Sequence, residues 1–197
     1  MHAFRDCVPN MWKAIKSALG MGVSPDSPDV AEAKQRMQLD HADVRKRYVW
    51  CVRAITDDKV DSAYLPEFAS KALREWYGMK SAKQLAENIE YYLAGTGSTP
   101  AYDVARAVFM ARAGFGAGFL SDTESWEAAF RAARKMKAAY PSWNHYGTAY
   151  IDGHLAYRKS QGDAEPVLAG YKRNMLEKFG QIARTGPWAA MPYETPI

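Results

Sequence analysis

The sequence predicts an all-α protein, a single compact domain of about seven helices that ends in an extended, proline-rich strap. Apolar residues recur at three- and four-residue steps along most of the chain, which is the spacing of one helix face. Ser, Thr, Pro and Gly stand where such helices would begin and end. No run of useful length alternates apolar and polar residues, so no strand is predicted.

The size and composition of the chain fit one domain over residues 1–197. Hydrophobic side chains make up 48% and aromatic ones 13%, which argues against disorder. The formal charge of +4 is a slight excess of cations, which permits an anionic partner without requiring one. Cys7 and Cys51 give neither a metal-ligand spacing nor a disulfide framework, which favours a reducing compartment. Since no apolar run has the length of a signal peptide or a membrane span, we expect a soluble, cytoplasmic protein.

The N-terminal quarter predicts a short helix, a linker and then a long helical pattern. Residues 10–19 form a basic amphipathic stretch, which could bind a membrane surface but is short for that, so docking on its own domain is expected. Residues 20–29 are a linker by composition, with two glycines and two prolines. Pro28 suits the first turn of the next helix. The pattern from there to about Ile55 fits one long helix or two abutting ones.

Two more helices are predicted at residues 65–77 and 81–93, the second with a capping box at its start. Three carboxylates, Asp57, Asp58 and Asp61, precede them. They lack the glycine and terminal glutamate of a calcium loop, so a turn is the better interpretation. The stretch GTGST that follows has neither the lysine of a phosphate loop nor a preceding strand, so it predicts no nucleotide site.

Residues 99–157 predict three consecutive helices with clear start signals, and they hold the densest set of aromatic and polar residues. Thr99, Ser121 and Ser142 are the expected N-caps. Glycines at 114, 116 and 118 indicate tight turning and close helix approach rather than a dinucleotide loop, because no strand precedes them. A last helix is expected at 164–180. Residues 183–197, with three prolines, predict an irregular tail laid on the surface as a strap.

The runs LREWYGMKSAKQLAENIEYYL, AYDVARAVFMARAGFGAGFLSDTESWEAAF and PSWNHYGTAYIDGH resemble the bacterial family called domain of unknown function 1266. The resemblance covers about residues 73–158. The family usually has tryptophan where Tyr102 stands and arginine where His154 stands, so this chain departs from it at two positions. The resemblance implies an accessory protein of bacteria, with some members encoded near secretion, contact-dependent competition or chaperone genes. It implies no settled activity. The features that match are Trp76 before a capped helix, the Asp103/Arg106 pair, the glycine-rich turn before Trp126, Ser142 with Trp143, and Tyr150 with Gly153.

One polar pair on an otherwise apolar helix is the basis of the candidate site. Asp103 and Arg106 are three residues apart, so they can pair with each other. The pair is either a buried salt bridge that fixes helix register or an arginine that meets an anionic ligand or a partner's carboxylate. The candidate polar cluster or binding site consists of Tyr102, Asp103, Arg106, Trp143, Tyr150 and His154.

Metal and nucleophile chemistry are not predicted. His145, Asp152 and His154 lack the spacing of a zinc hydrolase, and we expect no metal and no cofactor. There is no G-x-S-x-G motif, and nothing in the sequence would activate the thiol of Cys7 or that of Cys51. The catalytic residues, if any exist, are not identified by these patterns.

We therefore expect a non-enzymatic protein that binds another protein, and specifically an immunity-type or accessory component of a toxin or effector system. The alternative is an enzyme or toxin effector of unknown reaction, with its site in a groove around Asp103, Arg106, Trp143 and Tyr150. A third hypothesis is a weak nucleic-acid binder, although its cations include few aromatic neighbours for base stacking. Those cations are Arg45, Lys46, Arg47, Arg131, Arg134, Lys135 and Lys137.

Overall fold

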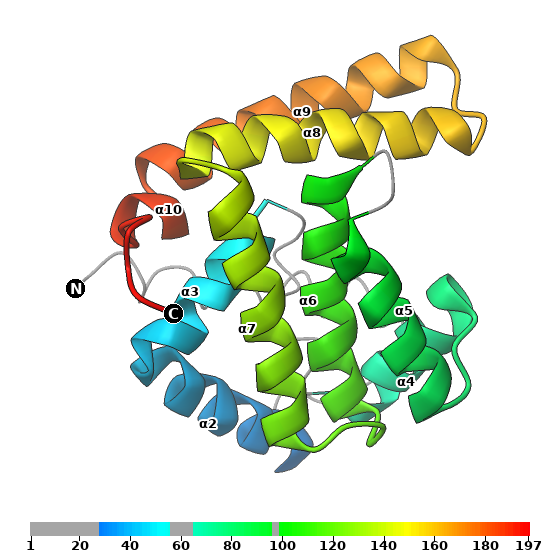
Figure 1. The fold of residues 1–197 in the computed structure, drawn as a ribbon, viewed down its shortest axis with the longest axis vertical. Coiled ribbons are helices and arrows are strands. Elements are labelled where there is room, and N and C mark those ends of the chain that lie inside the picture. Colours follow the sequence, from blue (N-terminus) through cyan, green and yellow to red (C-terminus); the bar gives the residue numbers. More distant parts are fainter. Residues whose placement is uncertain (1–27, 56–64, 96–98) are drawn as a thin grey trace.

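The computed structural model describes residues 28–55, 65–95 and 99–197, and all the regular structure in these ranges is helical (Figure 1). The all-α prediction is confirmed, and the eight helices longer than one turn are close to the predicted number. They are α2 (Pro28–Ala42), α3 (Val44–Arg53), α4 (Pro66–Tyr77), α5 (Ala82–Ala94), α6 (Pro100–Gly116), α7 (Asp122–Ala139), α8 (Trp143–Ser160) and α9 (Glu165–Arg184). A one-turn helix, α10 (Pro187–Ala190), follows. The predicted helix at 10–19, all but the last two residues of the linker at 20–29 and the aspartates at 57, 58 and 61 lie outside the described residues.

Helix α6 is the centre of the bundle and packs against α3, α4, α5, α7 and α8. Every residue from Ala107 to Gly114 is buried, and half of them are alanine or glycine. Small side chains let neighbouring helices approach closely. At Gly114 a Cβ atom would lie 2.4 Å from a side-chain carbon of Leu85, so the close approach predicted for the glycine-rich stretch occurs here. Of its three glycines, Gly118 has the positive φ, 74°, that the turn requires.

The helix boundaries follow from side-chain caps. Asp43 accepts hydrogen bonds from the backbone of Arg45 and Lys46, which ends α2 and begins α3, so the long N-terminal pattern is two abutting helices. Ser121 and Glu124 form the predicted capping box of α7. Thr99 differs from the prediction, because its side chain makes no capping bond to the backbone of α6. Its hydroxyl instead donates to Oδ1 of Asp103, 3.0 Å away.

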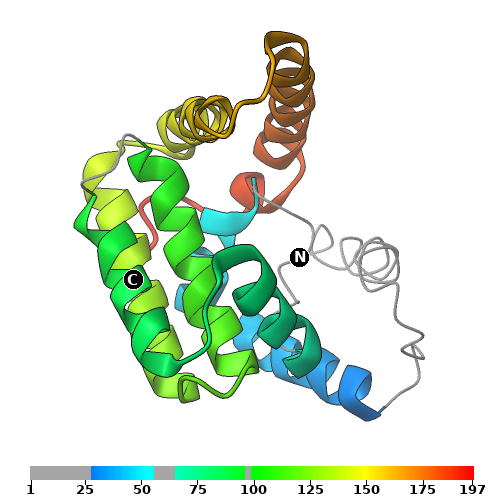
Figure 2. The ribbon, with the colours of Figure 1, turned by 90° about the vertical axis from the view of Figure 1, so that its right-hand side faces the viewer.

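Helices α8 and α9 form an antiparallel hairpin that lies across one end of α6 and α7 (Figure 1). Figure 2 shows α9 on the outer side, away from α6, and it packs mainly on α8 and α10. Gly147 permits this contact. A Cβ atom there would lie 2.6 Å from the ring of Phe179 and 2.8 Å from the ring of Trp188.

The C-terminal tail is more deeply inserted than the sequence predicts. Residues 187–190 form a helical turn, and the side chains of Trp188, Met191 and Tyr193 are buried rather than laid on the surface. The indole of Trp188 donates to the carbonyl of Cys51 at 2.7 Å, and the indole of Trp143 donates to that of Met191 at 2.8 Å. These bonds satisfy the polar atoms of aromatic rings that would otherwise stay outside the core.

The close approach at Gly147 generates a stability prediction. Gly147→Ala should lower the free energy of unfolding by about 1–3 kcal/mol, because the added methyl group overpacks the rings of Phe179 and Trp188. Gly170→Ala is the matched control. Its Cβ meets nothing within 4 Å, so the better helix propensity of alanine should raise stability by about 1 kcal/mol or less. Urea denaturation followed by circular dichroism measures both. Equal effects of the two substitutions would contradict this account of the hairpin.

Candidate functional site

Arg106 lies among three tyrosine rings that come from three helices. Its guanidinium carbon is 4.3 Å from the ring centre of Tyr92 on α5, 4.4 Å from that of Tyr102 on α6 and 4.9 Å from that of Tyr157 on α8. Such cation–π contacts are worth about 0.5–2 kcal/mol each, with the larger values where water is excluded. We call these four residues together with Asp103 the Arg106 cluster.

Asp103 supplies the counter-charge of this cluster. Its side chain is 4% exposed, against 13% for Arg106, and Oδ1 accepts hydrogen bonds from Nη2 of Arg106 and from the hydroxyl of Thr99. Burial opposes the charge on Arg106, but the bond to Asp103 and the nearby tyrosines outweigh it and raise the pKa of Arg106. The predicted pairing of Asp103 with Arg106 is present, and it links adjacent turns of α6.

His154 continues the cluster toward α9. Its ring centre lies 5.0 Å from that of Tyr102 and 6.0 Å from that of Tyr171. Burial, followed by the charges of Arg158 and Arg106, lowers the pKa of His154 to about 4, so the imidazole is neutral at pH 7. Its Nδ1 atom is buried and has no hydrogen-bond partner.

The tyrosines and the described cysteine give little support to acid–base or nucleophilic catalysis. Burial raises the pKa values of Tyr92 and Tyr102, and it raises that of Tyr150 well above the ordinary value. These hydroxyls therefore stay protonated at pH 7 and can act as hydrogen-bond donors. Burial also raises the pKa of the Cys51 thiol to about 12, which keeps it in the unreactive protonated form.

Trp143 belongs to a different group of side chains. Its ring stacks on Trp188 at a centroid distance of 5.4 Å and meets Tyr193 edge-on at 5.1 Å. Of the six residues in the candidate set, the structure thus brings Tyr102, Asp103, Arg106, Tyr150 and His154 together and places Trp143 against the tail. Tyr92 and Tyr157 join the cluster although the candidate set did not include them. Tyr157 carried a signal, since it shares a helix face with Tyr150 and His154.

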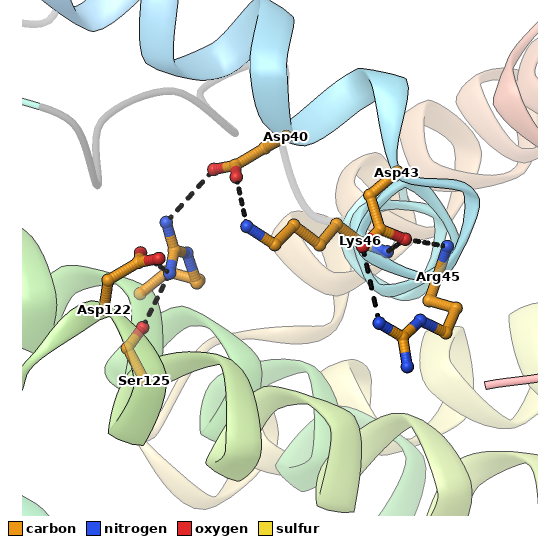
Figure 3. Close-up of polar contacts among 7 residues, drawn as sticks. Asp40, Asp43, Arg45, Lys46, Asp122 and Ser125 are labelled. Carbon is orange, nitrogen blue, oxygen red and sulfur yellow. Dashed lines mark hydrogen bonds and ion pairs between the residues drawn. The ribbon is translucent and has the colours of Figure 1, made fainter.

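A second arginine of α6 was missed altogether. The side chain of Arg112 is 0% exposed and contacts Asp40 of α2 at 3.5 Å, Asp122 at 3.2 Å and Ser125 of α7 at 2.9 Å (Figure 3). Its guanidinium carbon lies 3.9 Å from the ring centre of Trp126. The sequence held a signal: Arg112 is four residues after Val108, on the apolar stripe of its helix. The contacts of Arg112 tie α2, α6 and α7 into one polar junction.

The cations proposed for nucleic-acid binding are largely engaged within the chain. Arg131 forms a fork with Glu90 at 2.8 and 2.6 Å, and Lys137 donates to the carbonyl of Thr195 at 2.7 Å. Cations held by internal carboxylates and carbonyls offer less charge to a phosphate backbone. Further internal contacts join Lys135 to the carbonyl of Leu93, Lys46 to Asp40 and Arg45 to Asp43.

Metal ligands do not gather in the part of the chain that the structure covers. Within residues 28–55, 65–95 and 99–197 no three His, Cys, Asp or Glu side chains are placed to hold a metal ion. His145 lies at the start of α8, where its ring contacts the capping hydroxyl of Ser142 at 2.8 Å. Among the same residues, no helix is long and apolar enough to cross a membrane.

The burial of His154 predicts a pH dependence of stability. In the unfolded chain His154 binds a proton below about pH 6.5, whereas in the folded protein it does so only below about pH 4. The free energy of unfolding therefore falls as the pH is lowered through this window. His154→Phe keeps an aromatic ring and removes the titration. It should reduce the loss of stability between pH 7 and pH 4 by about 1–2 kcal/mol, after a discount for partial exposure. Denaturation at a series of pH values compares the two proteins, and His41, whose pKa is also lowered, is common to both.

The ion pair of the cluster predicts unequal costs for two arginine substitutions. Arg106→Met should destabilise the protein by about 3–5 kcal/mol, because it leaves the buried carboxylate of Asp103 without its cation. Arg131→Met removes an exposed pair with Glu90 and should cost about 1 kcal/mol or less. Thermal denaturation measures both, and similar costs would show that the Arg106 pair behaves as a surface pair.

Comparison with known proteins identifies the family to which this chain belongs. The family model described as "Protein of unknown function (DUF1266)" matches residues 28–193, a longer stretch than the residues 73–158 on which the sequence resemblance rests. No curated protein and no solved structure gave a match. Since the family model covers most of the chain, including every residue of the Arg106 cluster, this protein belongs to the DUF1266 family.

Proposed function

We propose that this protein is a non-catalytic cytoplasmic protein of bacteria that binds another protein at the exposed edge of the α8–α9 hairpin. The edge consists of Val167 and Tyr171 on α9 and Arg158 on α8, and we call it the hairpin edge. Val167 and Tyr171 are one turn apart, so their side chains lie on the same face of α9.

The observation that carries this proposal is the exposure of α9. Only two of its twenty residues, Leu168 and Ile182, are buried, whereas Val167 is 47% exposed and Tyr171 is 37% exposed. Large apolar side chains in water favour association, and aromatic residues are common anchors of protein interfaces. A partner that covers Val167 and the ring of Tyr171 would remove this apolar area from water.

Contacts within the chain fix the side chains of Arg158 and Tyr171 at the hairpin edge. The hydroxyl of Tyr171 accepts a hydrogen bond from Nη2 of Arg158 at 3.1 Å, and the guanidinium carbon of Arg158 lies 4.7 Å from the tyrosine ring. Arg158 is in turn paired with Asp163 at 2.5 Å. A surface whose rotamers are already fixed loses less entropy on binding. This arrangement supports binding rather than turnover.

The specific form that we propose is an immunity-type or accessory component of a toxin or effector system. This part of the proposal rests on what the family resemblance implies. The chemistry of the Arg106 cluster is consistent with it, because the carboxylate of Asp103 is paired with Arg106 and the hydroxyls of Tyr92 and Tyr102 stay protonated. General acid–base catalysis would need a group poised to give or take a proton near neutral pH.

A pair of substitutions tests the hairpin edge. Val167→Glu places a charge at the centre of the proposed interface and should weaken partner binding at least tenfold. Leu39→Glu is the matched control, because Leu39 is also an exposed aliphatic residue, 67% accessible, on the distant helix α2. The partner is first captured from native lysate with the wild-type protein and identified. Its affinity for the three purified proteins is then measured by calorimetry.

Two results would contradict the proposal. One is that wild-type protein captures no stoichiometric protein partner. The other is that Val167→Glu binds the partner as tightly as Leu39→Glu does. Circular dichroism spectra of both variants establish that they are folded, so that lost binding is not lost structure.

A further inference from the structure

Arg106 does not use all of the hydrogen-bond donors of its guanidinium group. A guanidinium has five N–H donors, and the hydrogen bond of Arg106 to Asp103 leaves from Nη2. The Nε atom is buried and has no hydrogen-bond partner. A buried donor without an acceptor costs about 1–3 kcal/mol, so native proteins rarely leave one unless a water molecule or a ligand completes it.

A second unpartnered nitrogen lies in the same group of side chains. Nδ1 of His154 is buried without a hydrogen-bond partner. Tyr102 joins the two, because its ring contacts both the guanidinium of Arg106 and the imidazole of His154, at 4.4 and 5.0 Å. The indoles of Trp143 and Trp188 show the usual outcome for a buried donor, since each of them bonds to a backbone carbonyl.

The charges around Arg106 favour an anion as the missing acceptor. Tyr92 and Tyr102 keep their protons and His154 is neutral at pH 7, so none of these three side chains competes with a negative ligand for the guanidinium. Arg158 lies close enough for its charge, like that of Arg106, to disfavour protonation of His154. Asp103 contacts the guanidinium through Nη2, and its Oδ1 also accepts a hydrogen bond from the hydroxyl of Thr99, so this carboxylate does not use the other N–H groups of Arg106.

We infer that the Arg106 cluster is a binding site for a small oxyanion, a carboxylate or a phosphate. Arg106 binds the anion through the N–H groups that Asp103 leaves unused. The rings of Tyr92, Tyr102 and Tyr157 hold the guanidinium in place and screen it from water, which strengthens a charge-assisted hydrogen bond. Only 13% of the Arg106 side chain is exposed, so the ligand that we infer is a small oxyanion group rather than a large body. This inference is independent of protein binding at the hairpin edge.

The experiment follows the Nε–H signal of Arg106 by proton–nitrogen NMR of the full-length, nitrogen-15-labelled protein. The signal is assigned through bonds within the side chain. Inorganic phosphate and acetate are added in separate titrations at constant ionic strength, with sodium chloride as the balancing salt. The Nε–H signal of Arg131, whose fork to Glu90 lies on the surface, is the internal control.

A saturable shift of the Arg106 signal, with a midpoint in the millimolar range and no matching shift at Arg131, is the expected result. Saturation by acetate alone assigns a carboxylate ligand, and saturation by phosphate alone assigns a phosphate. Arg106→Lys keeps the charge but loses the planar fork, so phosphate or acetate binding, followed by backbone signals of α6, should weaken at least tenfold.

The inference is overturned if Arg106 shifts no more than Arg131 with either anion, because the cluster is then an ion pair completed by water. Should Arg106→Lys fail to fold, the titrations of the wild-type protein still decide the question. The wild-type titrations do not depend on whether a protein partner exists, so the two proposals can fail separately.

Discussion

The burial of α6 is the constraint on which the rest of this structure depends. A helix enclosed by five others exposes little of its polar side chains to water, so its charged residues form pairs within the protein. Arg112 meets Asp40, Asp122 and Ser125, and Arg106 meets Asp103 under three tyrosine rings. These contacts also fix where the surrounding helices lie, because removing one partner would leave a buried charge.

The two arginines of α6 differ in how completely they are enclosed. Arg112 is fully buried and contacts groups from two other helices, which suits a permanent junction (Figure 3). Arg106 keeps 13% of its side chain in solvent and pairs with one carboxylate, that of Asp103. That difference is why a ligand is inferred at Arg106 and a structural role at Arg112.

The aromatic residues form two groups, one buried around Trp143 and one that extends from Arg106 to the surface. Around Trp143, the rings of Tyr48, Trp188 and Tyr193 close the core over the C-terminal tail, and their polar atoms bond to backbone carbonyls. Around Arg106, the hydroxyls of Tyr92 and Tyr102 remain donors at neutral pH, and the contacts continue through His154 and Tyr171 to the surface of α9. The inferred anion site and the proposed hairpin edge therefore lie on the same side of the molecule as this second aromatic group.

The sequence by itself determined the helices and their ends. Apolar spacing and local caps such as Ser121 with Glu124 act within a few residues, so they can be read without knowing the fold. The pairing of Asp103 with Arg106 was predictable for the same reason, since both lie on adjacent turns of one helix.

Only the tertiary structure decided what those helices bring together. Tyr92 and Tyr157 are 65 residues apart in the chain, and only the crossing of α5 and α8 over α6 places both rings on Arg106. The burial of Arg112 against Asp40 depends on the docking of α2, and the insertion of Trp188 depends on the missing side chain of Gly147. Contacts of this kind are set by how helices pack, and the period of a single helix carries no information about its neighbours.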